Sequence, residues 1–581
     1  MTISLLRQYL HPYRSALWAV AALLLVQALG TLYLPYLNAQ IINDGVVTGD
    51  IGVIWRTGAL MLAISLVVGV VSVAATYLAA RNAMGFGRDV RASLFRQVDS
   101  FSLSEMNEFG APSLITRNTN DVQQVQMLVL MGQTMMISAP MMLIGGVFMA
   151  LHQNVRLSGL LLVVIPVMAV VVGTILFRAV PLSRVMQSKL DALNDILREN
   201  LTGIRVIRAF VRTGYEQDRF ERANEDITDV SLRLTRLFAL MMPSLMLVFN
   251  LSAVAVVWFG GGLIGEGEMP IGDLTAFLSY IMQILFSVMM AVMLFLMVPR
   301  AAASAERIQS VLSTEPSIQD PSSPVPAPGS GSVEFRDVEF RYPGAEEPVL
   351  CGIDLRLEPG RTTAVVGSTG SGKSTLINLI PRLFDVTAGQ VLVNGVDVRE
   401  QAQEELWAGI GFIPQKAFLF SGTVADNVRL GRRDATDEEV WAALTTAQAA
   451  DFVREFSDGL EHEVDQGGAN LSGGQRQRLS IARALIRDTP IYIFDDSFSA
   501  LDYATDARLR TALGRDPATR RANVIIVAQR ISTILHADQI VVLDHGRVVG
   551  LGTHEQLLAG CETYREIVSS QIDESDLSGA S

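Results

Sequence analysis

Long apolar runs dominate the first half of the chain, whereas short alternating runs dominate the second. Before residue 313, six stretches each hold the roughly 20 apolar residues that a bilayer-crossing helix needs. Six such runs in one half of a chain exclude a set of buried helices in a soluble protein. We therefore predict an α-helical transmembrane domain over residues 1–312, with spans at about 15–38, 56–80, 128–151, 157–180, 237–263 and 274–299.

Two polar segments, about 81–127 and 181–236, lie between these runs and keep a helical period, as in VMQSKLDALNDILRENL. We expect them to extend the membrane helices well beyond the bilayer. Each segment must turn at a tip, and EFGAPSLITRNTNDV (108–122) and AFVRTGYEQDRF (209–220) are the candidate tips. A short helix at such a tip could contact a soluble domain.

Basic residues predict the orientation. The segments 39–55 and 265–273 contain acidic residues but no Lys or Arg. Basic residues instead follow the second and fourth runs, at Arg81, Arg88, Arg91, Arg96, Arg178, Arg184 and Lys189. The positive-inside rule then places both termini in the cytosol. We expect a multi-pass protein of the inner membrane of a bacterium, in direct contact with the lipid bilayer.

After residue 312 the pattern changes to a linker rich in Pro, Ser and Gly, residues 313–332, which has little capacity to pack. Beyond it, VEFRDVEFRY alternates as a strand does, and short apolar strands alternate with helical stretches up to about residue 570. This order predicts an α/β domain, residues 333–570, around a largely parallel sheet. The tail, residues 571–581, is predicted to be disordered.

Composition narrows the classes of partner and cargo. A net charge of −13 without a basic block argues against a nucleic-acid partner. The apolar runs lack ionisable side chains at mid-depth, so an apolar or amphipathic cargo fits better than an ion. Their few polar residues are Gln27, Gln133, Asn250 and Gln283. Methionine clusters in the third and sixth runs could form an adaptable wall for the cargo, or simply pack against lipid and neighbouring helices.

The segment TTAVVGSTGSGKSTLINLI carries the strongest chemical motif. It matches G-x-x-x-x-G-K-[ST] between an apparent strand and a helix, the context in which backbone amides surround phosphates. Lys373 would reach the β- and γ-phosphates and Ser374 would hold Mg²⁺. Asp495, at the end of the apolar run IYIF, would complete the magnesium shell through water. The loop residues expected to bind the nucleotide are Gly367, Ser368, Thr369, Gly370, Ser371, Gly372, Lys373, Ser374 and Thr375.

The segment NLSGGQRQRLSIARAL, residues 470–485, resembles the signature sequence of ATP-binding cassette (ABC) transporters. Tyr342 resembles the aromatic residue that stacks on adenine, and Gln415 the glutamine that senses magnesium and the attacking water. SALD (499–502) resembles the loop that crosses the dimer interface. The first half is similar to half-size exporters in its six spans and in SLITRNTNDV and ENLTGIRVIRAF. The resemblance implies a six-helix transmembrane domain followed by an α/β P-loop nucleotide-binding domain, with ATP and Mg²⁺ as ligands.

The resemblance also implies a second subunit. In the family, the signature contacts the γ-phosphate of ATP held by the opposite subunit. Ser472, Gly473, Gly474 and Gln475 would therefore act in trans, and this chain is half of a transporter.

Two positions depart from the family pattern. The family carries a catalytic glutamate after the strand aspartate, where this chain has Asp496, and a switch histidine where it has Gln529. Aspartate holds its carboxylate back by about 1.5 Å, and a misplacement near 1 Å can cost ~10²-fold in rate. A neutral amide cannot become cationic. We expect this chain's own site to hold ATP with little hydrolysis, and its partner to be a different half-transporter with a competent site. A homodimer with two slow sites is the alternative.

The expected function is ATP-driven export of hydrophobic or amphipathic compounds, drugs or lipids, with hydrolysis mainly at the partner's site. An importer of a siderophore or lipid on the same scaffold, and an ATP-gated regulator without vectorial transport, are the alternatives. The sequence does not distinguish export from import.

Overall fold

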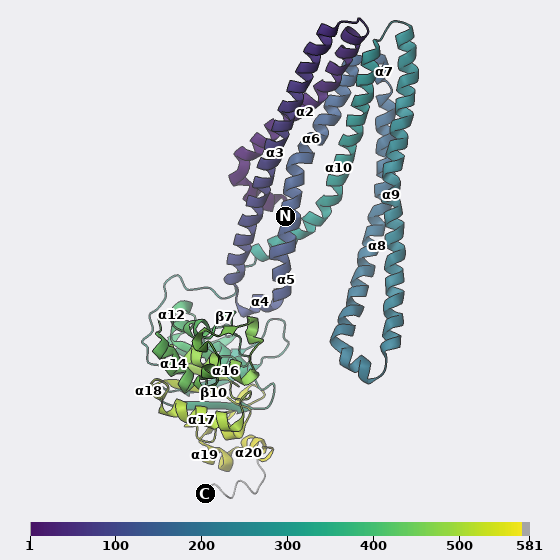
Figure 1. The fold of residues 1–581 in the computed structure, drawn as a ribbon. Coiled ribbons are helices and arrows are strands. Elements are labelled where there is room, and N and C mark those ends of the chain that lie inside the picture. Colours follow the sequence, from purple (N-terminus) through teal and green to yellow (C-terminus); the bar gives the residue numbers. More distant parts are fainter. Residues whose placement is uncertain (1, 572–581) are drawn as a thin grey trace. The chain divides into compact units, whose positions relative to one another are not determined.

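The computed structural model describes residues 2–571 (Figure 1). The chain forms two compact units. The helical unit runs to Asp99 and from Ala111 to Thr314, and the α/β unit contains Ser100–Gly110 and the chain from Glu315 onward. The tail predicted for residues 571–581 lies, apart from Gln571, outside the described residues.

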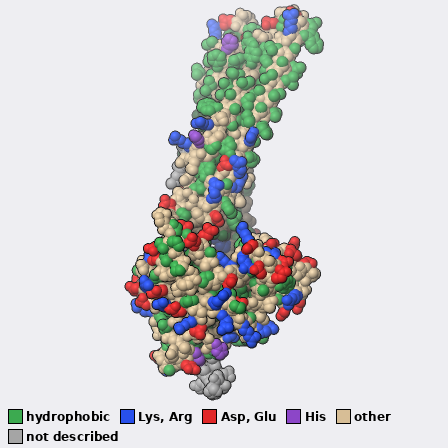
Figure 2. Space-filling model, turned by 90° about the vertical axis from the view of Figure 1, so that its left-hand side faces the viewer, with side chains coloured by type: hydrophobic (Ala, Val, Ile, Leu, Met, Phe, Trp, Pro, Cys, Tyr) green, Lys and Arg blue, Asp and Glu red, His purple; other side chains and the backbone are tan. Residues whose placement is uncertain are grey.

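The helical unit contains the six predicted spans. Six helices are long and apolar enough to cross a membrane among the described residues, which confirms the prediction. Figure 2 shows hydrophobic side chains covering much of the length of these helices, whereas charged side chains gather on the α/β unit. The elements are α1 (Thr2–Leu10), η1 (His11–Tyr13), α2 (Arg14–Gln40), η2 (Ile41–Val46), α3 (Ile51–Asp99), α5 (Ala111–Thr116), η3 (Arg117–Asp121), α6 (Val122–Gln153), α7 (Val155–Ser158), α8 (Leu161–Ala209), α9 (Thr213–Gly265) and α10 (Ile271–Leu312).

Within this unit α2, α3, α6 and α10 pack together, and α8 and α9 form a long hairpin (Figure 1). The hairpin helices contain 49 and 53 residues. At 1.5 Å per residue each is about 75 Å long, more than twice the ~30 Å of a bilayer core. These two helices are therefore much longer than a bilayer requires, as the expected extensions need.

Two polar side chains predicted inside the spans contribute to helix packing. Buried Gln133 on α6 accepts a hydrogen bond from Asn82 on α3, at 3.0 Å. Gln283 on α10 donates to the backbone carbonyl of Thr31 on α2, at 3.3 Å. Such interhelical hydrogen bonds stabilise helix pairs where the surroundings are apolar.

The turn at the first tip differs from the predicted one, whereas the turn at the second lies within the predicted segment 209–220. The first lies at Ser100–Gly110 and contains α4 (Leu103–Phe109), whereas most of the predicted segment 108–122 is helical. A capping box starts α4: Ser104 N donates to Ser102 Oγ, and Ser102 N donates to Glu105 Oε2 at 2.9 Å. Ser102 Oγ also lies 2.8 Å from Ser317 Oγ, so α4 packs within the α/β unit.

The second tip is only Phe210–Arg212, between α8 and α9, and carries no separate helix. Val211 there adopts φ 53°, which reverses the chain within three residues. Of the two tips, the first contains a short helix, α4, and the second does not.

The α/β unit has a six-stranded sheet of order β12-β11-β3-β10-β9-β6, parallel except for β12. A four-stranded antiparallel sheet, β2-β1-β4-β5, packs with it, and β7 pairs with β8. The strands are β1 (Val333–Phe340), β2 (Leu350–Leu357), β3 (Thr362–Gly367), β4 (Ala388–Val393), β5 (Val396–Asp397), β6 (Ile410–Ile413), β7 (Gly422–Thr423), β8 (Glu463–Val464), β9 (Ile491–Asp495), β10 (Asn523–Val527), β11 (Gln539–Asp544) and β12 (Arg547–Gly552).

Both faces of the parallel sheet are covered, as its apolar strands require. Alternate residues of β9 face two separate cores: Tyr492 and Phe494 one, Ile491 and Ile493 the other. The carboxyl ends of β3, β9 and β10 lie side by side, which assembles the site. The helices are α11 (Lys373–Leu379), α12 (Gln403–Ala408), α13 (Val424–Arg429), α14 (Asp437–Thr446), α15 (Ala450–Glu455), α16 (Gly473–Leu485), α17 (Tyr503–Arg515), α18 (Pro517–Arg521), α19 (His554–Gly560) and α20 (Glu562–Ser569), with short 3₁₀ turns η4 (Gly459–Glu461), η5 (Gln466–Gly468) and η6 (Ile531–Thr533).

Candidate nucleotide-binding site

The glycine-rich loop follows β3 directly and leads into α11. Gly370 and Gly372 adopt φ of 85° and 97°, a region that favours glycine. At Gly372 a Cβ would lie 2.8 Å from Leu350 Cδ2, so the backbone is also closely packed there. The loop can therefore turn its amides inward as phosphate binding requires.

Lys373 lies across the mouth of this loop. Its Nζ donates to the backbone carbonyls of Gly367, at 2.9 Å, and Ser368, at 2.7 Å. The pKa of Lys373 is lowered, because burial disfavours the ammonium more than the nearby carboxylates of Asp496 and Asp495 favour it. The ammonium is thus a compact charge held over the site where phosphates would enter.

Ser374 and Asp495 offer oxygen ligands that suit Mg²⁺. Ser374 Oγ donates to Asp495 Oδ1 at 3.1 Å. Burial raises the pKa of Asp495, and a bound divalent cation would offset that cost of ionisation. Among residues 2–571 no cluster of three or more His, Cys, Asp or Glu could hold a metal. Mg²⁺ bound to a nucleotide needs only one or two protein ligands, since phosphates and water supply the rest.

Asp496 lies next to Asp495 and is held by two amides. Its backbone has φ 46°, and the residue is 7% exposed. Gln415 Nε2 and Gln529 Nε2 both donate to Asp496 Oδ2, at 3.2 and 2.8 Å. Three residues from distant parts of the sequence therefore meet around one carboxylate.

These residues surround one cavity of about 330 Å³. Sequence analysis missed two apolar members of its lining, Val349 and Val527, because neither belongs to a chemical motif. Tyr342 does not line it; its hydroxyl lies 3.0 Å from Thr375 Oγ1, and its ring packs edge-on against Phe340. The lining is Val349, Thr369, Gly370, Gly372, Lys373, Ser374, Thr375, Gln415, Asp495, Asp496, Val527 and Gln529.

The signature residues are absent from this lining and start α16 instead. Ser472 is the N-cap: its Oγ accepts from Gln475 N at 3.2 Å, and Gln475 Oε1 accepts from Ser472 N at 2.8 Å. Ser472 and Gly473 are exposed. The helix therefore presents a solvent-facing N-terminus that suits an anion from outside this site.

A residue near the end of the described chain supports the segment after β10. Gln571 Nε2 donates to the carbonyl of Gln529, at 2.8 Å, and Gln571 Oε1 accepts from Ile531 N, at 2.9 Å. Arg530 between them lies over the ring of Tyr503, 4.8 Å from its centroid. Sequence reasoning missed Gln571, because no local pattern marks a contact 40 residues away.

The comparisons with known families agree with this geometry. Residues 17–288 match the family model described as the ABC transporter transmembrane region, and residues 350–499 match the model described as ABC transporter. An uncharacterized ABC transporter ATP-binding protein of Mycobacterium tuberculosis is 49% identical over 98% of each chain. The chain belongs to the ABC transporter family. It is a half-transporter, with one transmembrane region and one ATP-binding domain.

Other relatives of this half-transporter carry more specific names. A putative multidrug export ATP-binding/permease protein of Bacillus subtilis is 30% identical, over 97% of this chain and 98% of that protein. An ATP-dependent lipid A-core flippase of Syntrophus aciditrophicus is 32% identical, over 84% of this chain and 80% of that protein. A solved bacterial Atm1-family ABC exporter with ATP bound has the same fold, with a TM-score of 0.80 at 23% identity over 97% of this chain and 99% of that one.

Proposed function

We propose that this half-transporter exports hydrophobic or amphipathic compounds, lipids or drugs, as one subunit of a heterodimer. Its own site holds ATP with little hydrolysis, and its signature completes the hydrolytic site of a different partner. Its termini and nucleotide-binding domain lie in the cytosol of a bacterium, beneath the inner membrane.

The observation that carries this proposal is the position of the Asp496 carboxylate. An ionised carboxylate only accepts hydrogen bonds, so Gln415 and Gln529 must both turn their NH₂ groups toward it. The shared Oδ2 is thereby engaged by two amides. A general base must come within hydrogen-bond reach of the water that it activates. A side chain one methylene shorter than glutamate, with one oxygen already accepting from two amides, meets that condition poorly.

Gln529 supports the same conclusion through its charge. Its amide stays neutral at every physiological pH, whereas an imidazole can become cationic beside a developing negative charge. Gln529 also commits one of its donors to Asp496. The switch position of this site therefore adds no positive charge.

The remaining parts of the site favour binding over chemistry. Lys373 and the glycine loop suit the phosphates, and Ser374 and Asp495 suit Mg²⁺, which would neutralise phosphate charge when bound. The exposed N-terminus of α16 is intact and suits a γ-phosphate held by another subunit. The relatives named for multidrug export and for lipid A-core flipping support export of an amphipathic compound.

Co-purification tests the assembly. Full-length chain, isolated from cells that also express candidate half-transporters, should retain one that carries Glu after its strand aspartate and His at its switch position. The pair should show robust steady-state ATPase activity, and the chain alone should show little. Robust turnover by the chain alone would overturn the proposal.

A further inference from the structure

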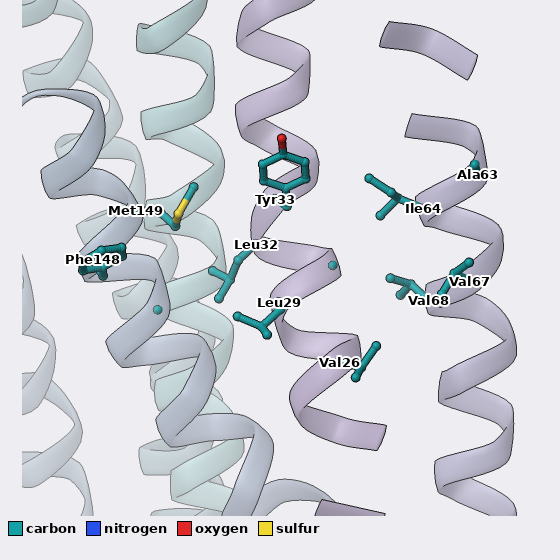
Figure 3. A pocket seen from close by; sticks show the side chains of 12 residues that line it. Val26, Leu29, Leu32, Tyr33, Ala63, Ile64, Val67, Val68, Phe148 and Met149 are labelled. Atoms are coloured by element: carbon teal, nitrogen blue, oxygen red, sulfur yellow. The ribbon is translucent and has the colours of Figure 1, made fainter. Parts of the chain in front are cut away.

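A second cavity lies within the helical unit, among α2, α3 and α6 (Figure 3). Its volume is about 660 Å³, within the ~300–1,000 Å³ typical of sites for small molecules. Figure 3 shows Ile64 and Val68 pointing from α3 toward α2. The lining comprises Val26, Leu29, Gly30, Leu32, Tyr33, Ala63, Ile64, Val67, Val68, Gly145, Phe148 and Met149.

The walls of this groove admit hydrocarbon and disfavour polar ligands. Tyr33 carries the one polar side-chain group in the lining. A polar ligand would lose its hydrogen bonds to water there without replacing them. The groove is open to the side, because Leu29, Val67 and Phe148 are 59, 55 and 67% exposed. A hydrocarbon chain can therefore enter from the surrounding bilayer.

Two glycines bring the walls close together. A Cβ on Gly30 would lie 2.4 Å from Val68 Cγ2, so α3 approaches the backbone of α2 there. A Cβ on Gly145 would lie 2.3 Å from Leu32 Cδ1, so α2 approaches α6 in the same way. The groove is thus shaped by specific close contacts between helices.

A band of aromatic and polar side chains borders one end of the groove. Tyr33 stacks on Tyr36, with ring centroids 5.5 Å apart, and Tyr36 lies 6.2 Å from the ring of His152. Gln40 Nε2 donates to Tyr36 Oη at 3.2 Å. Tyrosines with such polar partners favour the level of lipid headgroups. The band lies on the side away from Asp99 and Ala111, where α2 and α6 approach their ends at Gln40 and Gln153.

We propose that this groove binds one acyl chain of a bilayer phospholipid, with the ester or headgroup oxygens at the Tyr33–Tyr36 band. An acyl chain is already surrounded by hydrocarbon in the bilayer, so moving it into the groove gains no hydrophobic free energy. Its preference for the groove must come from packing against the closely spaced walls and from hydrogen bonding at Tyr33. The headgroup of this lipid would lie in the leaflet farther from Asp99 and Ala111. The inference needs only a membrane-embedded helical unit and is independent of the degenerate-site proposal.

Photo-labelling tests the site without any measurement of ATP turnover. Full-length chain is reconstituted in vesicles of phosphatidylcholine and phosphatidylglycerol with a trace of phosphatidylcholine that carries a diazirine midway along one acyl chain. After irradiation, peptides that contain residues 26–33, 63–68 and 145–149 should carry most of the label. The reference is Leu251–Phe259 on α9, where Leu251, Val254 and Trp258 are 61, 65 and 78% exposed.

Two matched variants on α3 test whether the groove itself holds the chain. Val67→Trp fills the groove and should reduce labelling of the three peptides roughly tenfold, equivalent to about 1.4 kcal/mol. Val70→Trp makes the same change at a residue that is 71% exposed and outside the lining, and should leave labelling unchanged. Ala63→Phe fills the groove from a second position and should repeat the loss.

Three outcomes would overturn the inference. Labelling could be equal on all exposed helices, or equally affected by both tryptophan variants. The lipid label could be absent while peptides of another subunit cross-link to the groove, which would identify the groove as a subunit interface. It could also be displaced by dodecylphosphocholine at a mole fraction far below that of the phospholipid, which would assign the groove to a transported amphipath.

Discussion

At the scale of single residues, Asp496 is the informative position. Its Oδ2 accepts from both Gln415 and Gln529, so the two departures from the family pattern contact each other directly. The motif residues could be found from the sequence, because each belongs to a short run with fixed spacing. Their convergence on one oxygen atom could not, because 81 residues separate Gln415 from Asp496 and 33 separate Gln529 from it.

Substitution at Asp496 should therefore be mild. Asp496→Asn keeps the shape of a side chain to which the proposal assigns no catalytic role, so heterodimer turnover should fall by less than about tenfold. Ser472→Arg places a bulky cation at the exposed N-terminus of α16, where a partner-held γ-phosphate needs backbone amides. Loss of such contacts should cost ~10²–10³-fold. Steady-state ATPase activity of the reconstituted pair compares the two, and equal damage would identify Asp496 as a working base.

At the scale of elements, the chain just after α20 contacts the segment that follows β10. The Gln571 side chain hydrogen-bonds both sides of residue 530, as a neighbouring strand would. Because Gln529 in turn donates to Asp496, α20 is connected to the site through one short segment. We therefore expect Gln571 to position Gln529.

Gln571→Ala should loosen that segment and speed release of ATP from this chain's own site. The two lost hydrogen bonds are worth about 1 kcal/mol each, so release should be several-fold faster. The dissociation rate of a fluorescent ATP analogue measures this release, and Ser570→Ala is the neighbouring control. Gln571→Glu keeps only the hydrogen-bond acceptor, so its dissociation rate should lie between those of the natural chain and Gln571→Ala. A purely structural role would lower the melting temperature and leave the dissociation rate unchanged.

The first tip shows why element boundaries were harder to predict. The sequence SLSE contains a capping box at Ser102 and Glu105, a local signal for a helix start. The predicted turn was placed several residues too far along the chain, because Gly110 and the polar segment after it are typical of a turn. In the structure that segment continues as helix, including the π-helical η3, where buried Asp121 accepts from Arg307 Nε at 2.8 Å. A contact 186 residues away leaves no mark on local periodicity.

At the scale of the whole molecule, the two-part organisation followed from the pattern of apolar runs and from the P-loop motif. Six apolar runs and one P-loop domain are dictated by the bilayer and by phosphate chemistry. The four-stranded antiparallel sheet was not predicted, because β1 pairs with β4 across intervening elements, a pairing that local periodicity does not indicate. The sequence does not identify the partner subunit. The exposed N-terminus of α16 suits an anionic ligand, and many chains could supply one.

Asymmetry between the two ATP sites should appear in the assembled transporter. Lys373→Ala removes the ammonium over this chain's own loop, so nucleotide binding there should weaken while part of the turnover remains. The equivalent change in the partner should abolish turnover, because the proposal assigns the chemistry to the partner's loop. ATPase activity and labelling by a photoreactive ATP analogue, measured on both mutant pairs, check this. Equal loss from both would show that the sites are equivalent.

The most direct test of the degenerate site is to restore its chemistry. Asp496→Glu with Gln529→His lengthens the carboxylate and replaces the neutral amide, so the purified full-length chain alone should gain ATPase activity by about 10²-fold, the cost expected of a 1 Å misplacement. Adding Lys373→Ala to this double variant should remove the gain, which would place the turnover at this chain's own loop. If the double variant binds ATP but hydrolyses it no faster than the natural chain, or if the natural chain is already fast, then Asp496 and Gln529 do not limit hydrolysis and the account is wrong.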